Sequence, residues 1–193
     1  MDLIGASLLL PVAVPFVAVF ATLVAVDGGT PFYAHERVGR GGRSFRCWKI
    51  RTMRPGADSQ LGDVLRMHPG ARREWERDRK LSTDPRVTRL GAILRRWSID
   101  ELPQLWNVLR GDMSLVGPRP VTREELPRYG RDIGHYCSAR PGLTGAWQVN
   151  RRADTTYEER VEMDREYLET QSLWRDILIL MMTLGTIFAP TGR

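Results

Sequence analysis

The chain carries the sequence SIDELPQL at residues 98–105, and the other motifs lie on both sides of this stretch. It places two adjacent carboxylates, Asp100 and Glu101, directly before Pro103 and an apolar run. A pair of arginines precedes it, and the stiff sequence GPRP follows it at residues 117–120. Carboxylates beside several cations are typical of metal-assisted chemistry on a phosphate group. The stretch therefore predicts a phosphate-handling site assembled from several segments.

Two helix starts compete here. Ser98 and Glu101 match the capping box, but that start puts Pro103 where its missing N–H costs a hydrogen bond. Asp100 as the N-cap keeps Pro103 in the first turn, where proline is tolerated. Either start places both carboxylates at a positive helix end, so we expect Asp100 to be an ionised nucleophile at neutral pH and the helix to end at Gly111. Capping alone also explains the pair, so a catalytic role is a hypothesis.

Length and charge limit the function classes. The chain has 193 residues, enough for one domain, and a net charge of +6. This charge favours an anionic partner, such as nucleic acid, lipid headgroups or a phosphorylated substrate. Cys47 and Cys137 belong to no CxxC or Cys/His cluster, so a disulfide is not indicated and a zinc site is not expected.

The N-terminal segment is apolar. Residues 3–26 contain no charge, and as a helix they would be about 36 Å long, against a bilayer core of about 30 Å. A cleaved signal peptide fits poorly, because a basic leader and a small-residue cleavage site are lacking. Pro11 and Pro15 each remove a helical hydrogen bond and favour a bend. A spanning helix and a bent helix that returns to the same face both fit this pattern.

A basic segment follows. Residues 35–54 hold seven Lys or Arg and one acid, which favours the cytoplasmic side of a membrane and contact with anionic lipid. Residues 32–38 and 44–53 are predicted as two extended pieces around a glycine turn. Lys49 and Arg51 would then point to one side, where they could serve a site. A lipid-facing basic hairpin is the alternative.

Arg119 lies between two prolines in the GPRP sequence. The prolines restrict the backbone, which suits a bidentate contact between the guanidinium and a phosphate; an exposed arginine in a turn is the simpler reading. The sequence RPGLTG at residues 140–145 repeats this kind of loop before AWQVN at residues 146–150. Further along the chain the pattern predicts a loop over residues 54–70 and helices over residues 71–81, 87–97, 155–169 and 172–188. The last is either buried or lies in a membrane interface, since Asp176 argues against a second crossing.

Several of these segments together resemble the bacterial sugar transferases, the small monotopic phosphoglycosyl transferases. The resemblance covers nearly the whole chain, and linked motifs in order are more specific than any one of them. They are PFY and ERVG at residues 31–39, WKIRTM at 48–53, SIDELPQ at 98–104, GPRP at 117–120, RPGLTG at 140–145 and QVN at 148–150.

The resemblance implies an enzyme that transfers a sugar 1-phosphate from a UDP-sugar to polyprenyl (undecaprenyl) phosphate, the first membrane step of exopolysaccharide or surface-glycan synthesis. Asp100 would attack the β-phosphorus and release UMP, and the polyprenyl phosphate would then attack the aspartyl-phosphosugar. Mg²⁺ is the implied cofactor, with Asp100 and Glu101 as its ligands; a role for Glu101 as a base stays open. We assign substrate binding to Lys49, Arg51, Arg95, Arg119 and Gln148. The sugar is not determined, with UDP-galactose or UDP-glucose favoured by family habit alone.

The implied fold is mainly α with a small β-hairpin. Residues 1–30 would form a membrane-embedded re-entrant helix broken at Pro11 and Pro15, and residues 31–193 a cytoplasmic catalytic domain with interfacial helices. Family members break this helix at a Ser-Pro pair, whereas this chain has Val14-Pro15 there. The resemblance favours re-entry at the cytoplasmic face of the bacterial inner membrane.

Two rival functions remain. One is a non-catalytic membrane-anchored protein whose basic hairpin binds anionic lipid or nucleic acid, with aromatic residues for stacking. The other is a two-sided span that recruits enzymes. The preferred reading has a UDP-sugar, polyprenyl phosphate and inner-membrane lipid as partners and no nucleic acid. The C-terminal helix permits a homodimer without requiring one.

Overall fold

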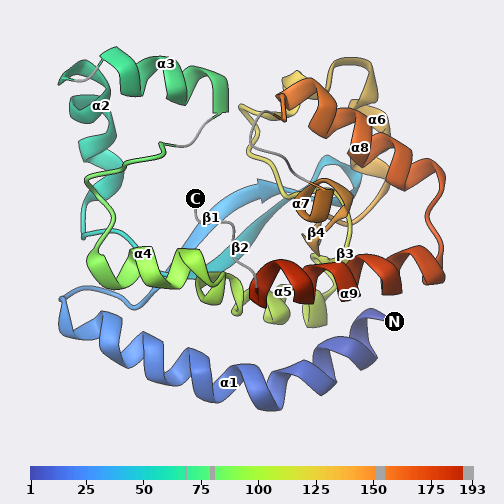
Figure 1. Cartoon of the computed structure of the whole chain (residues 1–193), viewed down its shortest axis with the longest axis horizontal. Coiled ribbons are helices and arrows are strands. Elements are labelled where there is room, and N and C mark those ends of the chain that lie inside the picture. The colour runs from blue at the N-terminus through green and yellow to red at the C-terminus, as the bar shows by residue number, and fades with distance from the viewer. Residues whose placement is uncertain (68, 79–80, 151–154, 189–193) are drawn as a thin grey trace.

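The computed structural model of the protein describes residues 1–67, 69–78, 81–150 and 155–188 (Figure 1). It is mainly helical with a small β-hairpin, as the sequence predicts. The helices are α1 (Asp2–Val26), α2 (Ala57–Met67), α3 (Pro69–Asp78), α4 (Arg89–Arg96), α5 (Gln104–Arg110), α6 (Ile133–Ser138), α7 (Ala146–Asn150), α8 (Tyr157–Glu169) and α9 (Leu173–Phe188). The strands are β1 (Phe32–Val38), β2 (Ser44–Ile50), β3 (Ser114–Val116) and β4 (Gly142–Thr144), and short 3-10 turns cover Arg40–Gly42, Ile99–Glu101 and Leu126–Asp132.

Helix α1 is one continuous, bowed helix along the lower edge of the molecule, and both of its ends turn toward the other elements (Figure 1). Pro11 and Pro15 lie inside it without ending it. Its buried residues are mostly small, which allows close packing: Ala6 and Ala13 join a core cluster with Leu105 of α5. Only 17% of its most apolar stretch is buried, although the helix is long and apolar enough to cross a bilayer.

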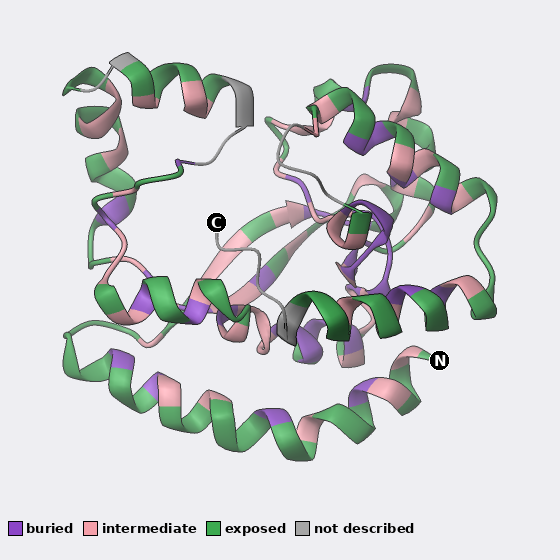
Figure 2. Ribbon diagram, viewed as in Figure 1, coloured by how far each residue is buried: buried purple, intermediate pink, exposed green. Residues whose placement is uncertain are grey.

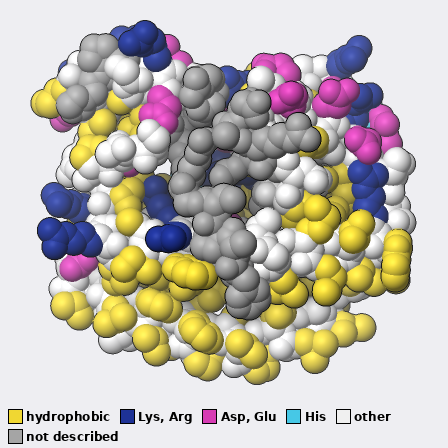
Figure 3. All heavy atoms as spheres, viewed as in Figure 1, with side chains coloured by type: hydrophobic (Ala, Val, Ile, Leu, Met, Phe, Trp, Pro, Cys, Tyr) yellow, Lys and Arg dark blue, Asp and Glu magenta, His cyan; other side chains and the backbone are white. Residues whose placement is uncertain are grey.

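The large apolar residues of α1 point outward instead. Figure 2 shows α1 and α9 largely in the colour of exposed residues, and Figure 3 shows hydrophobic side chains gathered along the lower edge of this view. We call the exposed large apolar residues of the two helices the apolar face. They are Leu3, Ile4, Leu8, Leu9, Val12, Val14, Phe16, Val19, Leu23, Val26, Leu173, Trp174, Ile177, Leu178, Met181, Met182 and Leu184. A patch of this size on a protein surface marks contact with lipid or with another protein.

Strands β1 and β2 form the predicted antiparallel hairpin, with Tyr33 opposite Lys49 and Val38 opposite Ser44. The turn between them needs Gly41 and Gly42, whose φ angles of 69° and 71° lie in the left-handed region. The hairpin is therefore set by its glycines and by alternation along the strands.

Helix α5 is fixed to β2 by one side chain. The Asn107 amide donates to the Arg46 carbonyl at 2.7 Å, and its Oδ1 accepts from the Trp48 backbone N–H at 3.1 Å. Asn107 is 1% exposed, so these bonds replace hydrogen bonds to water inside the core. They set the register between β2 and the segment that precedes α5.

Helix α4 packs on the chain just beyond β2. A side chain at Gly91 would place its Cβ 2.0 Å from the Thr52 carbonyl oxygen, so only glycine allows this approach. Thr88 caps the helix, accepting from the Gly91 N–H at 2.9 Å. The predicted helix over residues 87–97 is confirmed, and its end leads directly into the carboxylate pair.

Two predicted loops are in fact ordered elements. The segment predicted as a loop over residues 54–70 contains α2, because Pro55 and Gly56 precede the helix and Gly62 is tolerated inside it. Strands β3 and β4 pair in parallel, with Ser114 opposite Gly142. The glycines of these loops had masked short elements whose pairing is non-local.

Candidate active site

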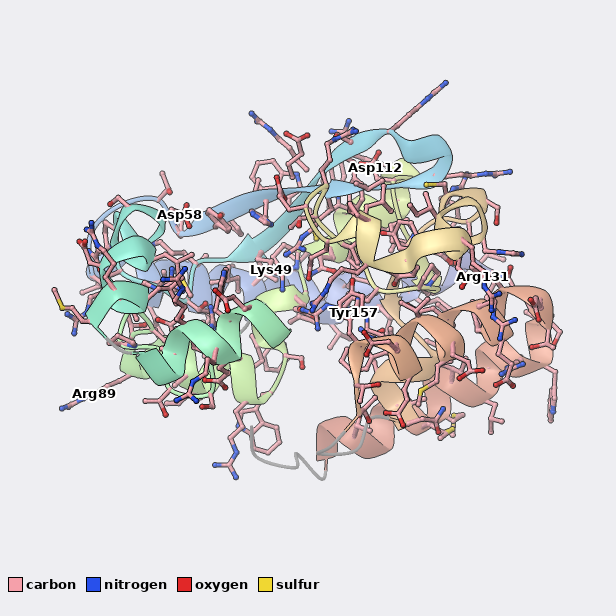
Figure 4. All side chains as sticks on the ribbon, turned by 90° about the horizontal axis from the view of Figure 1, so that it is seen from above. Lys49, Asp58, Arg89, Asp112, Arg131 and Tyr157 are labelled. Atoms are coloured by element: carbon pink, nitrogen blue, oxygen red, sulfur yellow. The ribbon has the colours of Figure 1, made fainter. Side chains whose placement is uncertain are left out.

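The carboxylate pair faces a lysine from the hairpin. Lys49 Nζ on β2 lies 2.5 Å from Glu101 Oε1 and 4.0 Å from Asp100 Oδ2. Figure 4, viewed from above, shows Lys49 toward the middle of the molecule, away from Arg89 at the rim. Asp100 is only 6% exposed. The structure thus brings together three of the predicted site residues from segments about 50 positions apart.

The predicted N-caps are wrong. Asp100 lies in the 3-10 turn Ile99–Glu101, before which Ser98 adopts a left-handed conformation with φ of 54° and makes no capping hydrogen bond. Helix α5 begins only at Gln104, with Pro103 as its N-cap. The turn aims the carboxylates at β2 rather than at the amides of a helix start. A non-glycine residue in the left-handed region costs free energy and is frequent at functional sites.

The two carboxylates differ in acidity. Burial raises the pKa of Asp100, against the lowering effect of Lys49, and the Glu101 charge raises it further. For Glu101 burial also acts to raise the pKa, but the charge and the hydrogen bond of Lys49 outweigh it and lower the pKa. The expectation that a helix end stabilises both charges therefore fails for Asp100. Lys49 stabilises the Glu101 carboxylate most directly.

Lys49 itself stays charged. Burial would lower its pKa, but the Glu101 and Asp100 carboxylates outweigh burial and raise it. A cation held between two carboxylates is well placed to meet a phosphate oxygen as well. The site thus presents a nucleophile candidate, a second acid and a fixed ammonium group together.

Arg95 reaches the site from α4. Its Nε donates to Thr52 Oγ1 at 2.9 Å, and its charge is among those that lower the pKa of Asp100. The Thr52 hydroxyl, 7% exposed, therefore positions a cation that the sequence pattern assigns to phosphate binding.

Arg119 adds a further cation near Glu101. Its guanidinium carbon is 5.9 Å from the centroid of the Trp147 ring, which it faces, and its charge helps to lower the pKa of Glu101. Pro118 fixes the loop, its carbonyl accepting from the Gly142 N–H at 2.8 Å. Burial lowers the pKa of Arg119, and the nearby Arg160 charge lowers it further.

A second ion pair borders this region. Arg37 Nη1 on β1 lies 3.1 Å from Glu125 Oε2, and that carboxylate also accepts from the Thr122 backbone N–H at 3.0 Å. From the sequence, Arg37 is predicted only as one of the charges of the basic hairpin.

Two of the predicted binding residues donate hydrogen bonds to backbone carbonyls, and their roles in substrate binding stay predictions. The Arg51 guanidinium donates to backbone carbonyls around the end of α1, including Val24 and Gly28, and so ties that end to the hairpin. Gln148 follows Trp147 on α7, and its amide donates to the Leu143 carbonyl at 3.2 Å. Pro11 and Pro15 line an open apolar pocket of about 610 Å³ between α1 and α5.

Two side chains near the site were missed from the sequence. Asn107 fixes α5 to β2, and Arg160 on α8 lies over the Trp147 ring. A polar residue on the buried side of a predicted helix is the signal that both share. Arg160 could have been found in this way, because the apolar stripe of residues 155–169 passes through its position.

The two carboxylates fit one mode of magnesium binding, in which the substrate supplies further ligands. Within the described residues, no group of three or more His, Cys, Asp or Glu side chains is placed to hold a metal. Mg²⁺ is usually bound by one or two carboxylates together with substrate phosphates. Asp100 and Glu101 supply that number, so the donor set agrees with an ion that arrives with a diphosphate.

Comparison with known proteins gives one consistent result. The family model for bacterial sugar transferases matches residues 1–190. The chain is 50% identical over 191 residues, 99% of its length, to the UDP-galactose-lipid carrier transferase of Erwinia amylovora, of which it covers 40%. It is 44% identical over 192 residues, 99% of its length, to the exopolysaccharide production protein ExoY of Rhizobium meliloti, of which it covers 85%.

A third relative is the UDP-glucose:undecaprenyl-phosphate glucose-1-phosphate transferase of Caulobacter vibrioides. The identity is 39% over 196 residues, covering 97% of this chain and 68% of that protein. The chain spans about two fifths of the length of several curated relatives that it matches. The sugars in these names differ, so the likeness does not select one.

Proposed function

The chain belongs to the bacterial sugar transferase family, and on that basis we propose that it transfers a sugar 1-phosphate from a UDP-sugar to undecaprenyl phosphate. The observation that carries the proposal is the buried Asp100 beside Glu101, with Lys49 at 4.0 Å from its Oδ2. Relatives whose names state this reaction with galactose or glucose cover the whole of the site region. The product would serve exopolysaccharide or another surface glycan.

The first step joins Asp100 to phosphorus. One Asp100 carboxylate oxygen attacks the β-phosphorus of the UDP-sugar, and the bond from that phosphorus to the bridging oxygen breaks. UMP leaves with the bridging oxygen and its electron pair, so no proton is needed. Lys49 favours the ionised form of Asp100 and binds the phosphoryl oxygens.

The second step returns the carboxylate. A phosphate oxygen of undecaprenyl phosphate attacks the phosphorus of the aspartyl-phosphosugar, and the bond to Asp100 breaks. The product is undecaprenyl-diphosphate sugar. A phosphate nucleophile is ionised at neutral pH, so Glu101 is not required as a base and serves to hold charge opposite Lys49. Asp100 and Glu101 would hold Mg²⁺, which when bound neutralises the diphosphate.

The acceptor lipid requires a membrane site, and we assign α1 to it as a re-entrant helix. Both ends of α1 are tied to the same body: Asp2 Oδ1 accepts from Ser114 Oγ at 2.9 Å, and Arg51 donates to the Val24 carbonyl at 3.0 Å. A straight spanning helix would put its two ends about 36 Å apart on opposite sides of the bilayer. The bow of α1 and its outward apolar residues support entry and return on one face.

Helix α9 extends this contact. Its exposed residues include Trp174 and Met181, while Asp176 accepts a hydrogen bond from the buried Tyr167 hydroxyl at 2.6 Å. This arrangement fits a helix lying in the interface rather than a second crossing. We place the protein at the cytoplasmic face of the bacterial inner membrane, because the segment that follows α1 is rich in Lys and Arg.

The test is UMP release from a panel of UDP-sugars, with the full chain in detergent or nanodiscs, Mg²⁺ and undecaprenyl phosphate. The proposal expects rapid release with one or two of the sugars, dependent on the acceptor beyond the first turnover. No release from any UDP-hexose or UDP-N-acetylhexosamine would contradict it and would favour a binding protein that carries no chemistry.

A further inference from the structure

Helix α8 presents unpaired polar atoms toward the interior. The buried side-chain atoms that lack a hydrogen-bond partner in the described part of the chain include Nε and Nη2 of Arg160 and the hydroxyl of Tyr157. Arg160 is 7% exposed, and the two residues lie on one face of α8, three positions apart. A buried guanidinium with unpaired donors costs free energy, so such groups call for a ligand.

The Arg160 guanidinium is held in place by aromatic rings. Its Cζ lies 5.1 Å from the centroid of the Trp147 ring and 4.9 Å from that of Tyr157. Arg119 lies over the same Trp147 ring at 5.9 Å. Two guanidiniums that share one indole are oriented before any ligand arrives, which lowers the entropy cost of binding.

Nearby acids raise the pKa of Arg160, but none of them forms a direct ion pair with it among the described residues. Glu125 is engaged by Arg37 and by the Thr122 N–H. Asp164 accepts from the Tyr129 hydroxyl at 2.7 Å, and among the described residues it forms no ion pair with Arg160 within 4.0 Å. The pKa of Arg119 is lowered by burial and by the Arg160 charge, so the two cations repel each other. A buried cation beside a half-buried one is a site for an anion.

We propose that Arg160, together with Arg119, binds the nucleotide phosphate that departs in the first step as UMP. The inference rests on the proposed function and adds a binding residue to it. Arg160 would donate from Nε and Nη2 to the α-phosphate oxygens, and the Tyr157 hydroxyl lies one turn away on the same face.

The position of the arginines selects this phosphate. Arg119 and Arg160 face the same Trp147 ring, and the Arg119 charge also acts on the Glu101 carboxylate. In the proposed arrangement the arginine pair therefore meets the substrate on the Arg119 side of the carboxylates. In phosphoryl transfer the nucleophile and the leaving oxygen are roughly in line on opposite sides of phosphorus. A diphosphate attacked by Asp100 would direct its leaving half toward Arg119 and Arg160.

A cation beside the leaving phosphate would stabilise the charge that develops on it in the first step. When the bond from the β-phosphorus to the bridging oxygen breaks, that oxygen keeps the electron pair and UMP gains one negative charge. The charge develops on the leaving phosphate, and donors fixed in advance at that point stabilise it without reorganisation. Arginine suits this position because its planar donors match two phosphate oxygens.

The experiment follows the first half-reaction alone. Labelled UMP is exchanged into unlabelled UDP-sugar without undecaprenyl phosphate, and the UMP concentration at half-maximal exchange is measured for the wild type and for Arg160→Gln, Arg160→Lys and Arg165→Gln. Arg165 is the control, because it is on the same helix but forms only exposed ion pairs. We expect UMP to bind about 10-fold more weakly to Arg160→Gln and about 3-fold more weakly to Arg160→Lys, and unchanged in the control. The KM for undecaprenyl phosphate should not change in the full reaction.

Each contrary result is informative. Unchanged UMP affinity in a folded Arg160→Gln variant would show that its donors hold only water, and a raised KM for undecaprenyl phosphate would assign Arg160 to the wrong phosphate. If Arg160→Gln fails to fold by circular dichroism, Arg160→Lys keeps the charge and decides the question. A wild type without any exchange would contradict the proposed function itself, and the anion site with it.

Discussion

The two sides of α5 differ in which side chains are exposed and which are buried. Toward α1 and the apolar face, large hydrophobic side chains are exposed, with Leu8 at 72% and Trp174 at 78%. Toward the hairpin, charged side chains are buried, with Asp100 at 6% and Arg160 at 7%. A protein that folds in water alone arranges these groups the other way round.

The two regions fit different parts of the proposed substrates. The exposed apolar residues are stable if hydrocarbon covers them, and the buried cations are stable if phosphates pair with them. The two substrates of the proposed reaction together offer both: the hydrocarbon chain of the lipid phosphate would cover the apolar residues, and the phosphates of the lipid and of the UDP-sugar would pair with the buried cations. The contrast therefore supports the proposed acceptor more strongly than either region does alone.

The largest effect on activity is expected among the buried charged residues. Asp100→Asn keeps the size of the side chain but cannot form the aspartyl-phosphosugar. We expect UMP release to fall on the order of 10³-fold or more. Asp63→Asn, an exposed aspartate on α2, is the matched control. Turnover within 10-fold of the wild type in the Asp100 variant would remove the nucleophile from the account.

The apolar face is tested by introducing a charged residue into it. Val12 is 63% exposed near the middle of the bowed α1. An arginine at the centre of a membrane helix costs about 2.5–3.5 kcal/mol, so Val12→Arg should weaken vesicle binding about 100-fold in a flotation assay. Asp63→Arg adds the same side chain on the polar side and should leave vesicle binding unchanged. Equal flotation of Val12→Arg would mean that the apolar face binds something other than lipid.

The buried acids predict how stability depends on pH. Burial raises the pKa of Asp164 to about 6, so the folded state binds a proton that the unfolded state releases near pH 4. Stability from this group is therefore present at low pH and is lost as pH rises through 6, by about 2 kcal/mol between pH 4.5 and 7. Urea unfolding of Asp164→Asn should lack that part of the slope. Parallel wild-type and variant profiles would contradict the assignment.

The smallest effect concerns the support of Arg95. Thr52→Val keeps the shape of the side chain but removes the hydroxyl that accepts from Arg95 Nε. One such hydrogen bond contributes about 0.5–1.5 kcal/mol, so kcat should fall about 3- to 10-fold while the melting temperature changes little. A fall in the melting temperature with unchanged kcat would make Thr52 a purely structural residue.

Local signals in the sequence predicted much of the fold. The glycines at 41 and 42 and the alternation around them gave the hairpin, and Gly111 gave the end of α5. Short elements were missed where pairing is non-local, as in β3 with β4. Pro55 and Gly62 hid α2, because a proline just before a helix and a glycine tolerated inside it look the same as the turn residues of a loop.

The charged residues of the motifs lie together in the structure, and their roles stay predictions. Asp100, Glu101, Lys49, Arg95 and Arg119 lie within one charged neighbourhood in the structure. The prediction for Arg51 assumed that the strand alternation continues through it. Strand β2 ends at Ile50, and the Arg51 guanidinium donates to carbonyls at the end of α1. Asn107 and Arg160 act across the core, and no neighbouring residues in the sequence show what they contact.

The most direct test of the central claim is covalent capture. The wild type and Asp100→Asn are incubated with Mg²⁺ and a UDP-sugar carrying ³²P in its β-phosphate, without acceptor lipid, and the protein is then denatured. We expect label on the wild-type peptide containing Asp100, released by hydroxylamine, and none on the variant. UMP release by the wild type with no trapped label, or equal label on the variant, would contradict it.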